Sequence, residues 1–315
     1  MWSFLGVLGC ASAELEDGPE ARDPESIISE GRNALAEAGV TRIRWGMTSF
    51  RDPDTAQERW APLWDHVGQE LGVEVEVVQL EAYEGVEGAM RRGEIDGATF
   101  RPWAYVDTFA AMPLQLVCTH VVKGSSDYGA YVIMLEDQSV RDVDGLSDLA
   151  GGPFGFVHPK STSGFVYPAS MLLREGVHPL DDLQPRWYGS HSGVFDAVAN
   201  GKVLAGAVYS EELDLADLRS PGAPSMRIIA KSERIPYSAY VLRQGLPEAA
   251  ADALQVVLNE VSTQDPEGRE ILLSLPDING FLPISDKSYD SVRSAAKTLD
   301  DAEIDIGAID VGSGG

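Results

Sequence analysis

The chain contains 315 residues, carries a formal net charge of -26 at pH 7, and is 44% hydrophobic. Its length predicts about two domains, and its acidity argues against nucleic-acid binding, which requires clustered lysines and arginines. A small anion is not excluded, because salt limits the reach of surface charge to about 8–10 Å. No apolar run reaches about 18 residues, so we expect no membrane-spanning helix.

The N-terminal segment has features of an export signal. Cys10 follows Val7-Leu8-Gly9, an apolar-apolar-small pattern typical of a bacterial lipobox, in which the cysteine is lipidated after cleavage. The preceding segment is short and lacks Lys and Arg, and residues 11–13 offer a second cleavage site, so both export routes and an ordinary cytoplasmic N-terminus stay open. Residues 11–24 are acidic and poor in large apolar side chains, so we expect 1–40 to combine a signal or lipobox segment with a flexible tether.

Strand and helix patterns alternate from residue 41 onward, which predicts an α/β fold with largely parallel sheets. A helix predicted at 55–72 is the clearest of these elements, because its large apolar side chains fall on one face and Gly72 ends it. The first predicted elements are a strand at 42–47, that helix at 55–72, a strand at 73–78 and a short helix at 83–92.

A repeated turn indicates that two lobes share one plan. A glycine turn leads into a short strand at 93–98 and again at 201–208. Extended segments at 117–131 and 228–241 predict two crossings between the lobes. We expect lobe 1 at 41–122 plus 235–300, lobe 2 at 123–234, and a loose acidic tail at 301–315.

Three consecutive hydroxyl side chains and a glycine, Ser161-Thr162-Ser163-Gly164, follow an apolar strand and begin a predicted helix. The free N–H groups and partial positive charge of a helix N-terminus attract anions. Gly164 would let the backbone approach a ligand. A plain helix cap is the alternative, although a cap needs only one hydroxyl. Pro168 falls early in this helix and should kink or restart it.

A second polar turn, Gly189-Ser190-His191, leads into a helix predicted at 194–200. His191 is a candidate donor to an anion, and a surface or capping histidine is the alternative. Tyr105, in the aromatic segment 100–105, is a candidate for a cleft wall, although the local pattern favours a core position.

The remaining cysteine and histidine residues indicate no further chemistry. Cys118 lies in an apolar run and is expected to be a buried free thiol, not the disulfide partner of Cys10. The histidines lack the spacing of metal ligands, so we expect neither a metal site nor a cofactor.

In their order along the chain, these motifs resemble the phosphate/phosphite/phosphonate family of periplasmic solute-binding proteins. The family implies a type II periplasmic binding protein fold, with two α/β lobes joined by a two-strand hinge around a cleft that closes on its ligand. The segments that carry the resemblance are Ser161-Thr162-Ser163-Gly164 with Pro168, Gly189-Ser190-His191, and 197–208, with weaker agreement over 46–93 and at Tyr105.

The resemblance also implies the ligand-binding residues. They are Ser161, Thr162, Ser163, Gly164 and His191 from the second lobe, Tyr105 from the first, and Ser49 in the loop after the first strand. Tyr209 joins this set at a position where family members often have a carboxylate, which would accept a hydrogen bond from a protonated oxyanion or pair with a ligand amine. Glu211 and Glu212 are candidates to replace that carboxylate.

The resemblance implies a monomeric extracytoplasmic protein that captures phosphonate, phosphite or phosphate for an ABC importer. It would be periplasmic or on the cell surface, with a lipid anchor at Cys10 if the lipobox is used. The alternatives are a ligand-sensing lipoprotein of the same fold and binding of a different small anion. We do not expect an enzyme, because a Ser163–His191 hydrolase would need an activated serine and the chain has no Gly-x-Ser-x-Gly elbow.

Overall fold

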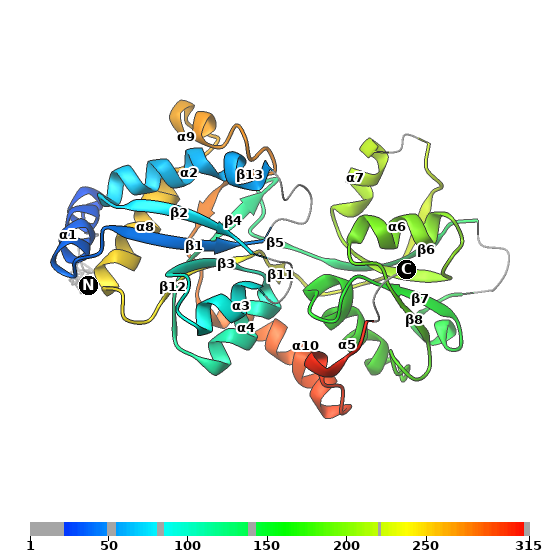
Figure 1. Ribbon diagram of the computed structural model, residues 1–315. Coiled ribbons are helices and arrows are strands. Elements are labelled where there is room, and N and C mark those ends of the chain that lie inside the picture. The colour runs from blue at the N-terminus through cyan, green and yellow to red at the C-terminus, as the bar shows by residue number, and fades with distance from the viewer. Residues whose placement is uncertain (1–21, 49–54, 81–84, 138–142, 220–221, 312–315) are drawn as a thin grey trace, which may run out of the picture.

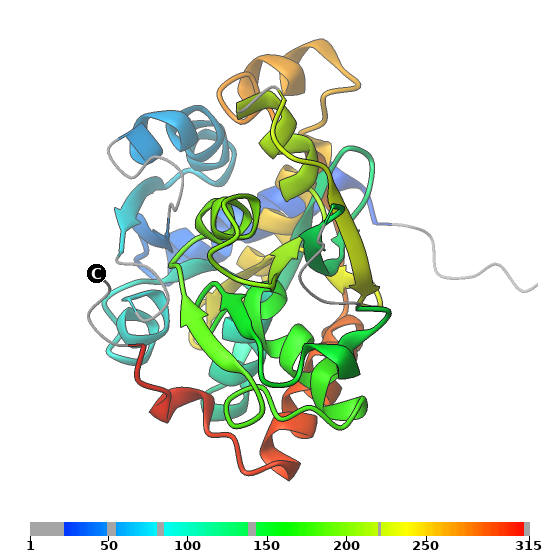
Figure 2. The ribbon, with the colours of Figure 1, turned by 90° about the vertical axis from the view of Figure 1, so that its right-hand side faces the viewer.

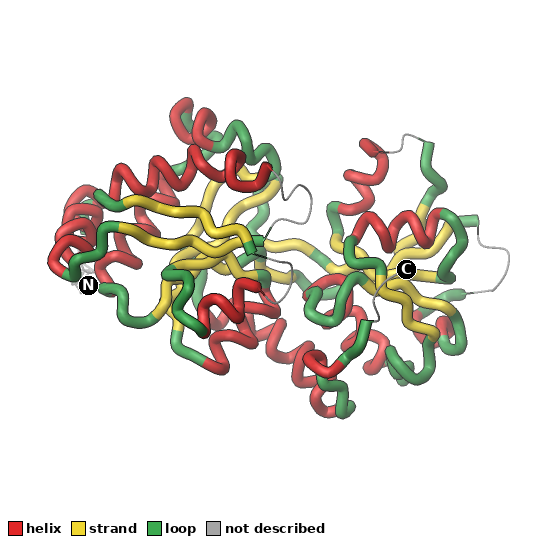
Figure 3. Tube along the Cα trace, in the orientation of Figure 1, coloured by secondary structure: helices red, strands yellow, loops and turns green. Residues whose placement is uncertain are grey.

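The computed structural model describes residues 22–48, 55–80, 85–137, 143–219 and 222–311. They form two α/β lobes that lie side by side (Figure 1), each with a central sheet and helices around it (Figure 3). In the view of Figure 2 the second lobe lies in front of the first. The expected fold class, two α/β lobes of the type II binding-protein kind, is confirmed.

The sheet of the first lobe has six strands. Their order is β13 (Ile278–Leu282), β4 (Leu114–Val122), β12 (Ala239–Arg243), β3 (Gly97–Phe100), β1 (Arg42–Met47) and β2 (Glu74–Gln79). β1 pairs in parallel with β2 and β3, whereas β12 is antiparallel to both β3 and β4. Strands from distant parts of the chain therefore complete this lobe.

The sheet of the second lobe has five strands. Their order is β10 (Met226–Lys231), β6 (Ala130–Leu135), β9 (Ala205–Tyr209), β7 (Pro153–Phe156) and β8 (Gln184–Trp187). β7 is parallel to β8 and β9, and β6 is antiparallel to β9 and β10. The parallel strands β7 and β9 both end toward the cleft, and the polar turns that follow them lie there.

The helix α2 (Ala56–Leu71) shows how the sequence builds the first core. Trp64 packs against Trp45 of β1, with 4.2 Å between ring centroids, and both side chains are 1% exposed. Gly72 then adopts φ 67°, a left-handed conformation that favours glycine, and ends the helix. The predicted helix at 55–72 is thereby confirmed.

The other helices surround the sheets or connect them. In the first lobe they are α3 (Gly85–Arg91), α4 (Pro102–Ala111), α8 (Glu248–Glu260), α9 (Pro266–Ile271) and η4 (Asp286–Tyr289). In the second lobe they are η2 (Leu146–Leu149), η3 (Thr162–Val166), α5 (Tyr167–Arg174), α6 (His191–Ala199) and α7 (Glu212–Arg219).

The structure corrects the expectation of a flexible tether up to residue 40. α1 (Pro24–Glu37) is a regular helix, capped by Asp23, and it packs along α8. A Cβ atom on Gly31 would collide with Ala253 of α8, so this glycine permits close contact between the two helices. The folded region therefore already includes α1, ahead of the start expected near residue 41; Cys10 lies outside the described residues.

The C-terminal segment is also more ordered than expected. α10 (Asp290–Asp301) contacts α4 of the first lobe and α5 of the second, so it does not belong to the first lobe alone. Beyond it, Ile304 and Ile306 are 4% and 7% exposed, and the short helix η5 (Ile306–Ala308) follows. The expected loose tail from residue 301 is therefore wrong for the part described, up to residue 311.

Cys118 agrees with its prediction. The side chain is fully buried in the first lobe and its thiol is free. Burial raises the pKa of this thiol well above its usual value, which leaves it unreactive.

The lobes are joined where β5 (Asp127–Tyr128) pairs antiparallel with β11 (Ile235–Pro236). β5 carries the chain toward the second lobe, and β11 carries it back. A two-strand connection of this kind permits the lobes to move about a hinge.

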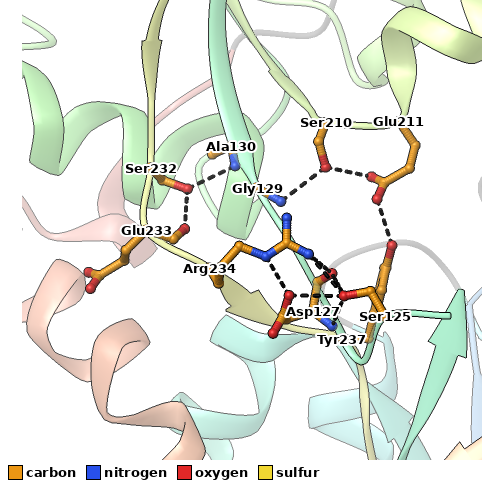
Figure 4. A network of polar contacts seen from close by, with 10 residues as sticks. All are labelled: Ser125, Asp127, Gly129, Ala130, Ser210, Glu211, Ser232, Glu233, Arg234 and Tyr237. Atoms are coloured by element: carbon orange, nitrogen blue, oxygen red, sulfur yellow. Dashed lines mark hydrogen bonds and ion pairs between the residues drawn. The ribbon is translucent and has the colours of Figure 1, made fainter. Parts of the chain in front are cut away.

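Polar side chains hold the hinge strands together (Figure 4). Arg234 forms an ion pair with Asp127 and donates a 2.9 Å hydrogen bond to the hydroxyl of Ser125. The hydroxyl of Tyr237 donates to a carboxylate oxygen of Glu211 at 2.7 Å. The contacts of Arg234 hold the two hinge strands together, and the hydrogen bond of Tyr237 connects the returning chain to the second lobe.

Candidate functional site

A cleft of about 750 Å³ lies between the lobes, beside the hinge. Both lobes and the hinge contribute to its walls, as expected for a binding protein that encloses its ligand. Among the lining residues are Thr48, Arg59, Trp60 and Arg101 from the first lobe, Tyr128 and Tyr237 from the hinge, and Ser161–Ser163, Gly189–Ser192, Tyr209 and Glu212 from the second lobe.

The turn after β7 places three hydroxyl side chains on the cleft wall. Ser161 caps the helix, because its Oγ accepts the N–H of Gly164 at 3.1 Å. The N–H groups of Thr162 and Ser163 have no acceptor among the described residues, as expected for the first residues of a helix. These two N–H groups and the hydroxyls of Ser161–Ser163 form a donor-rich surface suited to an anion, which we call the cradle. The helix cap and the cradle therefore occur in the same turn.

The same helix starts with an unusual turn. Residues Thr162–Val166 form a π-helical turn, and a regular α-helix begins at Tyr167, with Pro168 in its first turn. The expected restart of the helix near Pro168 is confirmed, because proline is tolerated at the start of a helix.

Gly164 has a role different from the one predicted. A Cβ atom at this position would collide with the side chain of Val157, so only glycine allows the turn to pack against the end of the preceding strand. Gly164 is not on the cleft wall. Its effect on a ligand would be indirect, through the placement of Ser161–Ser163.

Two of the hydroxyls have partners across the cleft. Thr162 Oγ1 accepts the N–H of Trp103, in the first turn of α4, at 3.0 Å. Ser163 also lies close enough to Tyr128 of the hinge to oppose part of the rise that burial causes in the pKa of Tyr128. The cradle in the second lobe is therefore connected to the first lobe and to the hinge.

A second helix N-terminus opens on the same cleft. Gly189, with φ 71°, makes the turn, and Ser190 caps α6 by accepting the N–H of Gly193 at 3.0 Å. Nδ1 of His191 accepts the backbone N–H of Tyr209 at 3.2 Å, and the two rings lie 4.6 Å apart. Because Nδ1 is an acceptor, the neutral imidazole carries its proton on Nε2, where it can donate.

The structure brings together most of the predicted residues but not Tyr105. Ser161, Thr162, Ser163, His191 and Tyr209 all line the cleft. The side chain of Tyr105 is 0% exposed and its hydroxyl donates to Asp286 at 2.8 Å, within the first lobe. Tyr105 is thus a core residue, as its local pattern favoured, and the implied ligand contact is corrected.

Ser49 lies outside the described residues, while its neighbour Thr48 lines the cleft.

Two hinge tyrosines line the cleft in place of Tyr105, and the sequence did not indicate them. Tyr128 and Tyr237 stack on each other, with 5.0 Å between ring centroids. Burial raises the pKa of both hydroxyls, so both stay protonated and able to donate near neutral pH. They lie in the extended segments expected at 117–131 and 228–241, and that pattern could not specify which side chains meet the cleft.

Three arginines on the walls were also missed. Arg59 and Arg101 come from the first lobe and Arg219 from α7 of the second. No local pattern in the sequence marks these three residues as neighbours of the hydroxyl cluster. Arg101 lies immediately before α4, and its positive charge opposes part of the rise that burial causes in the pKa of Tyr128, so it adds favourable potential near the hydroxyl cluster.

The two candidate carboxylates have different positions. Glu211 faces the hinge, where it accepts hydrogen bonds from Tyr237 and Ser210. Glu212 lies on the cleft wall, is 3% exposed, and forms an ion pair with Arg219 at 2.7 Å. Glu212 is therefore the acidic side chain near Tyr209 that borders the cleft, with its charge offset by an arginine.

Within the described residues, no helix is both long and apolar enough to cross a bilayer. Nor does that part of the chain gather three or more histidine, cysteine, aspartate or glutamate side chains at a place suited to a metal ion.

Comparison with known proteins gives consistent matches. Residues 45–289 match the family model described as ABC transporter, phosphonate, periplasmic substrate-binding protein. The phosphate-import protein PhnD of Mycolicibacterium smegmatis is 30% identical over 254 residues, which cover 74% of this chain and 78% of that protein. The phosphonates-binding periplasmic protein of Escherichia coli is 25% identical over 227 residues, or 70% of this chain and 66% of that protein.

Among solved structures, PhnD1 from Prochlorococcus marinus in complex with methylphosphonate superposes with a TM-score of 0.70 at 15% identity. The match covers 82% of this chain and 98% of that chain. At this level of identity the likeness shows a shared fold.

Proposed function

Because the chain belongs to the phosphonate family of periplasmic substrate-binding proteins of ABC transporters, we propose that its cleft captures phosphonate, phosphite or phosphate for delivery to an ABC permease. The family consists of transporter components and is not an enzyme class. Capture and release of the ligand, without chemical change, is the activity proposed.

The convergence of two helix N-termini on one cleft supports this proposal most strongly. η3 presents the N–H groups of Thr162 and Ser163, and α6 presents the Nε2–H of His191 beside its capped first turn. Donors from two helix ends can surround a tetrahedral oxyanion on several sides, and both helix dipoles favour negative charge. Protonated Tyr128 and cationic Arg101 add to this potential from the hinge and the first lobe.

The net charge of -26 does not oppose such binding. Most acidic side chains lie on the surface, where salt screens them beyond about 8–10 Å. The local donors within hydrogen-bonding distance of a ligand therefore determine the affinity.

Glu212 bears on ligand selection. Its position on the wall qualifies it, over Glu211, as the carboxylate near Tyr209 that a ligand would meet. Its ion pair with Arg219 offsets its charge, so we do not expect it to select a ligand amine. Aminoethylphosphonate should consequently bind no more tightly than ethylphosphonate.

We further propose that the exported protein is a monomer, anchored to the membrane by lipidation at Cys10. The lipobox-like pattern before Cys10 supports the anchor. Mass spectrometry of membrane-extracted protein would detect the lipid, and Cys10→Ala should release the protein into the soluble fraction. An unmodified Cys10 in the membrane fraction would contradict the anchor.

Calorimetry with phosphate, phosphite, methylphosphonate, ethylphosphonate and aminoethylphosphonate tests the central proposal. A ligand at 100 times its dissociation constant should raise the free energy of unfolding by about 2.7 kcal/mol. The double variant Thr162→Val, Ser163→Ala should lose this stabilisation. Ser170→Ala is the matched control, because Ser170 is a buried serine in α5 away from the cleft wall. Absence of binding by all five oxyanions would refute the proposal.

A further inference from the structure

The cleft extends beyond the two helix N-termini, into a region between α2 and α7. On α2, the residues Ala56, Arg59 and Trp60 face the cleft at helical spacing. On α7, the residues Glu212, Leu215 and Arg219 face it in the same way. One helix from each lobe therefore presents a single face to this space. Figure 1 shows α2 and α7 in the upper parts of their two lobes.

Three apolar side chains in this region do not suit an oxyanion. Trp60, Leu215 and Leu275 line it, and we call these three residues the outer subsite. Apart from the indole N–H of Trp60, these side chains have no hydrogen-bond donors, whereas every oxygen of a buried phosphonate needs donors. The outer subsite is chemically suited to carbon, while the cradle at Ser161–Ser163 is suited to oxygen.

The size of the cleft points in the same direction. Its volume of about 750 Å³ lies within the range of roughly 300–1,000 Å³ found for sites that bury drug-sized molecules. A bare tetrahedral oxyanion would occupy only a small part of such a space. A substituent attached to the oxyanion would extend from the cradle toward the outer subsite.

The charges around the outer subsite balance. Two arginines, Arg59 and Arg219, and two carboxylates, Glu212 and Asp277, border it. Glu212 and Arg219 pair at 2.7 Å, and Nε of Arg59 donates to the carbonyl of Ser274 at 3.1 Å. Because neither sign predominates, an additional charge on the substituent gains little here.

We propose that the ligand is a substituted phosphonate or a phosphate monoester whose uncharged aromatic or apolar group contacts the outer subsite while its oxyanion occupies the cradle. This inference rests on the proposed function and adds the class of organic substituent. The indole of Trp60, which is half-buried against the first core, offers a flat surface for stacking.

The affinities of the unmodified protein provide the first test. Calorimetry with methylphosphonate, phenylphosphonate and 3-phosphonopropionate compares a small, an aromatic and a charged substituent on one oxyanion. Phenylphosphonate should bind at least about tenfold more tightly than methylphosphonate, a difference of about 1.4 kcal/mol. The charged 3-phosphonopropionate should gain no such advantage.

The relative affinities of these ligands also distinguish failure of the outer subsite from failure of the proposed function. If methylphosphonate binds and phenylphosphonate binds equally or more weakly, the walls of the outer subsite close on each other and the inference is overturned. If none of the phosphorus oxyanions binds, the proposed function itself fails, and the inference fails with it.

Variants then locate the substituent. Trp60→Ala should weaken phenylphosphonate binding about tenfold and change methylphosphonate binding less than about twofold. Unchanged methylphosphonate binding also shows that the variant folds. Leu215→Ala tests the opposite wall, and Leu218→Ala is its matched control, because Leu218 lies on α7 but is 79% exposed and does not line the cleft. Equal losses for both ligands in Trp60→Ala would contradict a separate subsite for the organic group.

Discussion

The ion pair between Lys160 and Glu87 leads to a prediction about the contact between the lobes. Lys160 Nζ, in the turn before η3, lies 3.3 Å from Oε2 of Glu87 in α3, and the two side chains are 19% and 6% exposed. Burial raises the pKa of Glu87, while the charges of Lys160 and Arg101 oppose this rise. Lys160→Met would leave a buried carboxylate with only part of its compensation.

The expected loss follows from that burial. Breaking a buried ion pair by removing one partner costs about 3–5 kcal/mol. The remaining charge of Arg101 places this case near the lower value, so we expect Lys160→Met to lower the free energy of unfolding by about 3 kcal/mol at pH 7. Adding Glu87→Gln to the same chain should recover most of the loss, because the uncompensated charge is then absent.

The pH dependence has a definite sign. A folded-state pKa of Glu87 above its unfolded value means that the folded protein binds more protons, so stability falls as the pH rises through the interval between the two values. Lys160→Met raises the folded-state pKa of Glu87 further, so the stability that this variant loses relative to the wild type should decrease as the pH is lowered from 7 toward 5. Urea unfolding followed by tryptophan fluorescence measures both effects.

Lys202→Met is the control for this experiment, because Lys202 is an exposed lysine of the second lobe. Its effect should stay within about 0.5 kcal/mol. A loss below about 1 kcal/mol for Lys160→Met, or a loss that is equal at pH 5 and pH 7, would refute the view that burial makes this pair important.

Three further predictions concern single residues. The pKa of Asp96 is lowered from 3.8 to about 2 because hydrogen bonds from two arginines outweigh the effect of its burial. The ionised carboxylate should therefore contribute about 2 kcal/mol of stability at neutral pH, and this contribution is lost as the pH falls from about 4 to about 2. Acid unfolding of the wild type and of Asp96→Asn measures the contribution. Gly164→Ala should cost about 1–3 kcal/mol in urea unfolding, because the new methyl group meets Val157; an unchanged midpoint would contradict the packing role. Tyr237→Phe should cost about 1–3 kcal/mol by removing the donor to the Glu211 carboxylate, and a variant as stable as the wild type would show that water replaces that hydroxyl.

Local sequence patterns predicted much of the fold. The helix at Ala56–Leu71 was recognisable because its apolar residues recur at helical spacing and Gly72 follows them. The repeated glycine turns also corresponded to real structure, since Gly93 and Gly201 both adopt positive φ and precede β3 and β9. Such features depend on a few neighbouring residues, which is why the sequence alone reveals them.

The missed helix at the N-terminus had a usable signal. Asp23-Pro24 is a typical helix start, and Ile28, Gly31 and Leu35 recur at helical spacing toward α8. The acidic composition of the preceding residues obscured this pattern. The acidic composition of residues 11–24 was extended to residue 40, and α1 was therefore wrongly expected to be part of a flexible tether.

The errors at the site have another cause. Tyr105 was assigned to the cleft from the resemblance, yet its hydrogen-bond partner, Asp286, lies far along the chain and could not be found from local spacing. Arg59 and Tyr128 reach the cleft through the arrangement of a helix and a hinge strand. Residues that meet only after both lobes have folded leave no local pattern.

The C-terminal helix α10 gives the molecule a further link between its lobes, in addition to the two hinge strands and the contacts of Lys160 and Thr162 with the first lobe. Ser291 of α10 accepts a 2.8 Å hydrogen bond from Tyr167 of the second lobe, while α10 also contacts α4 of the first. Two strands alone would allow the lobes both to bend and to twist. An attachment through α10, away from the hinge strands, opposes the twist. Closure should therefore follow one rotational path, and the same residues of the two cleft walls should meet each time.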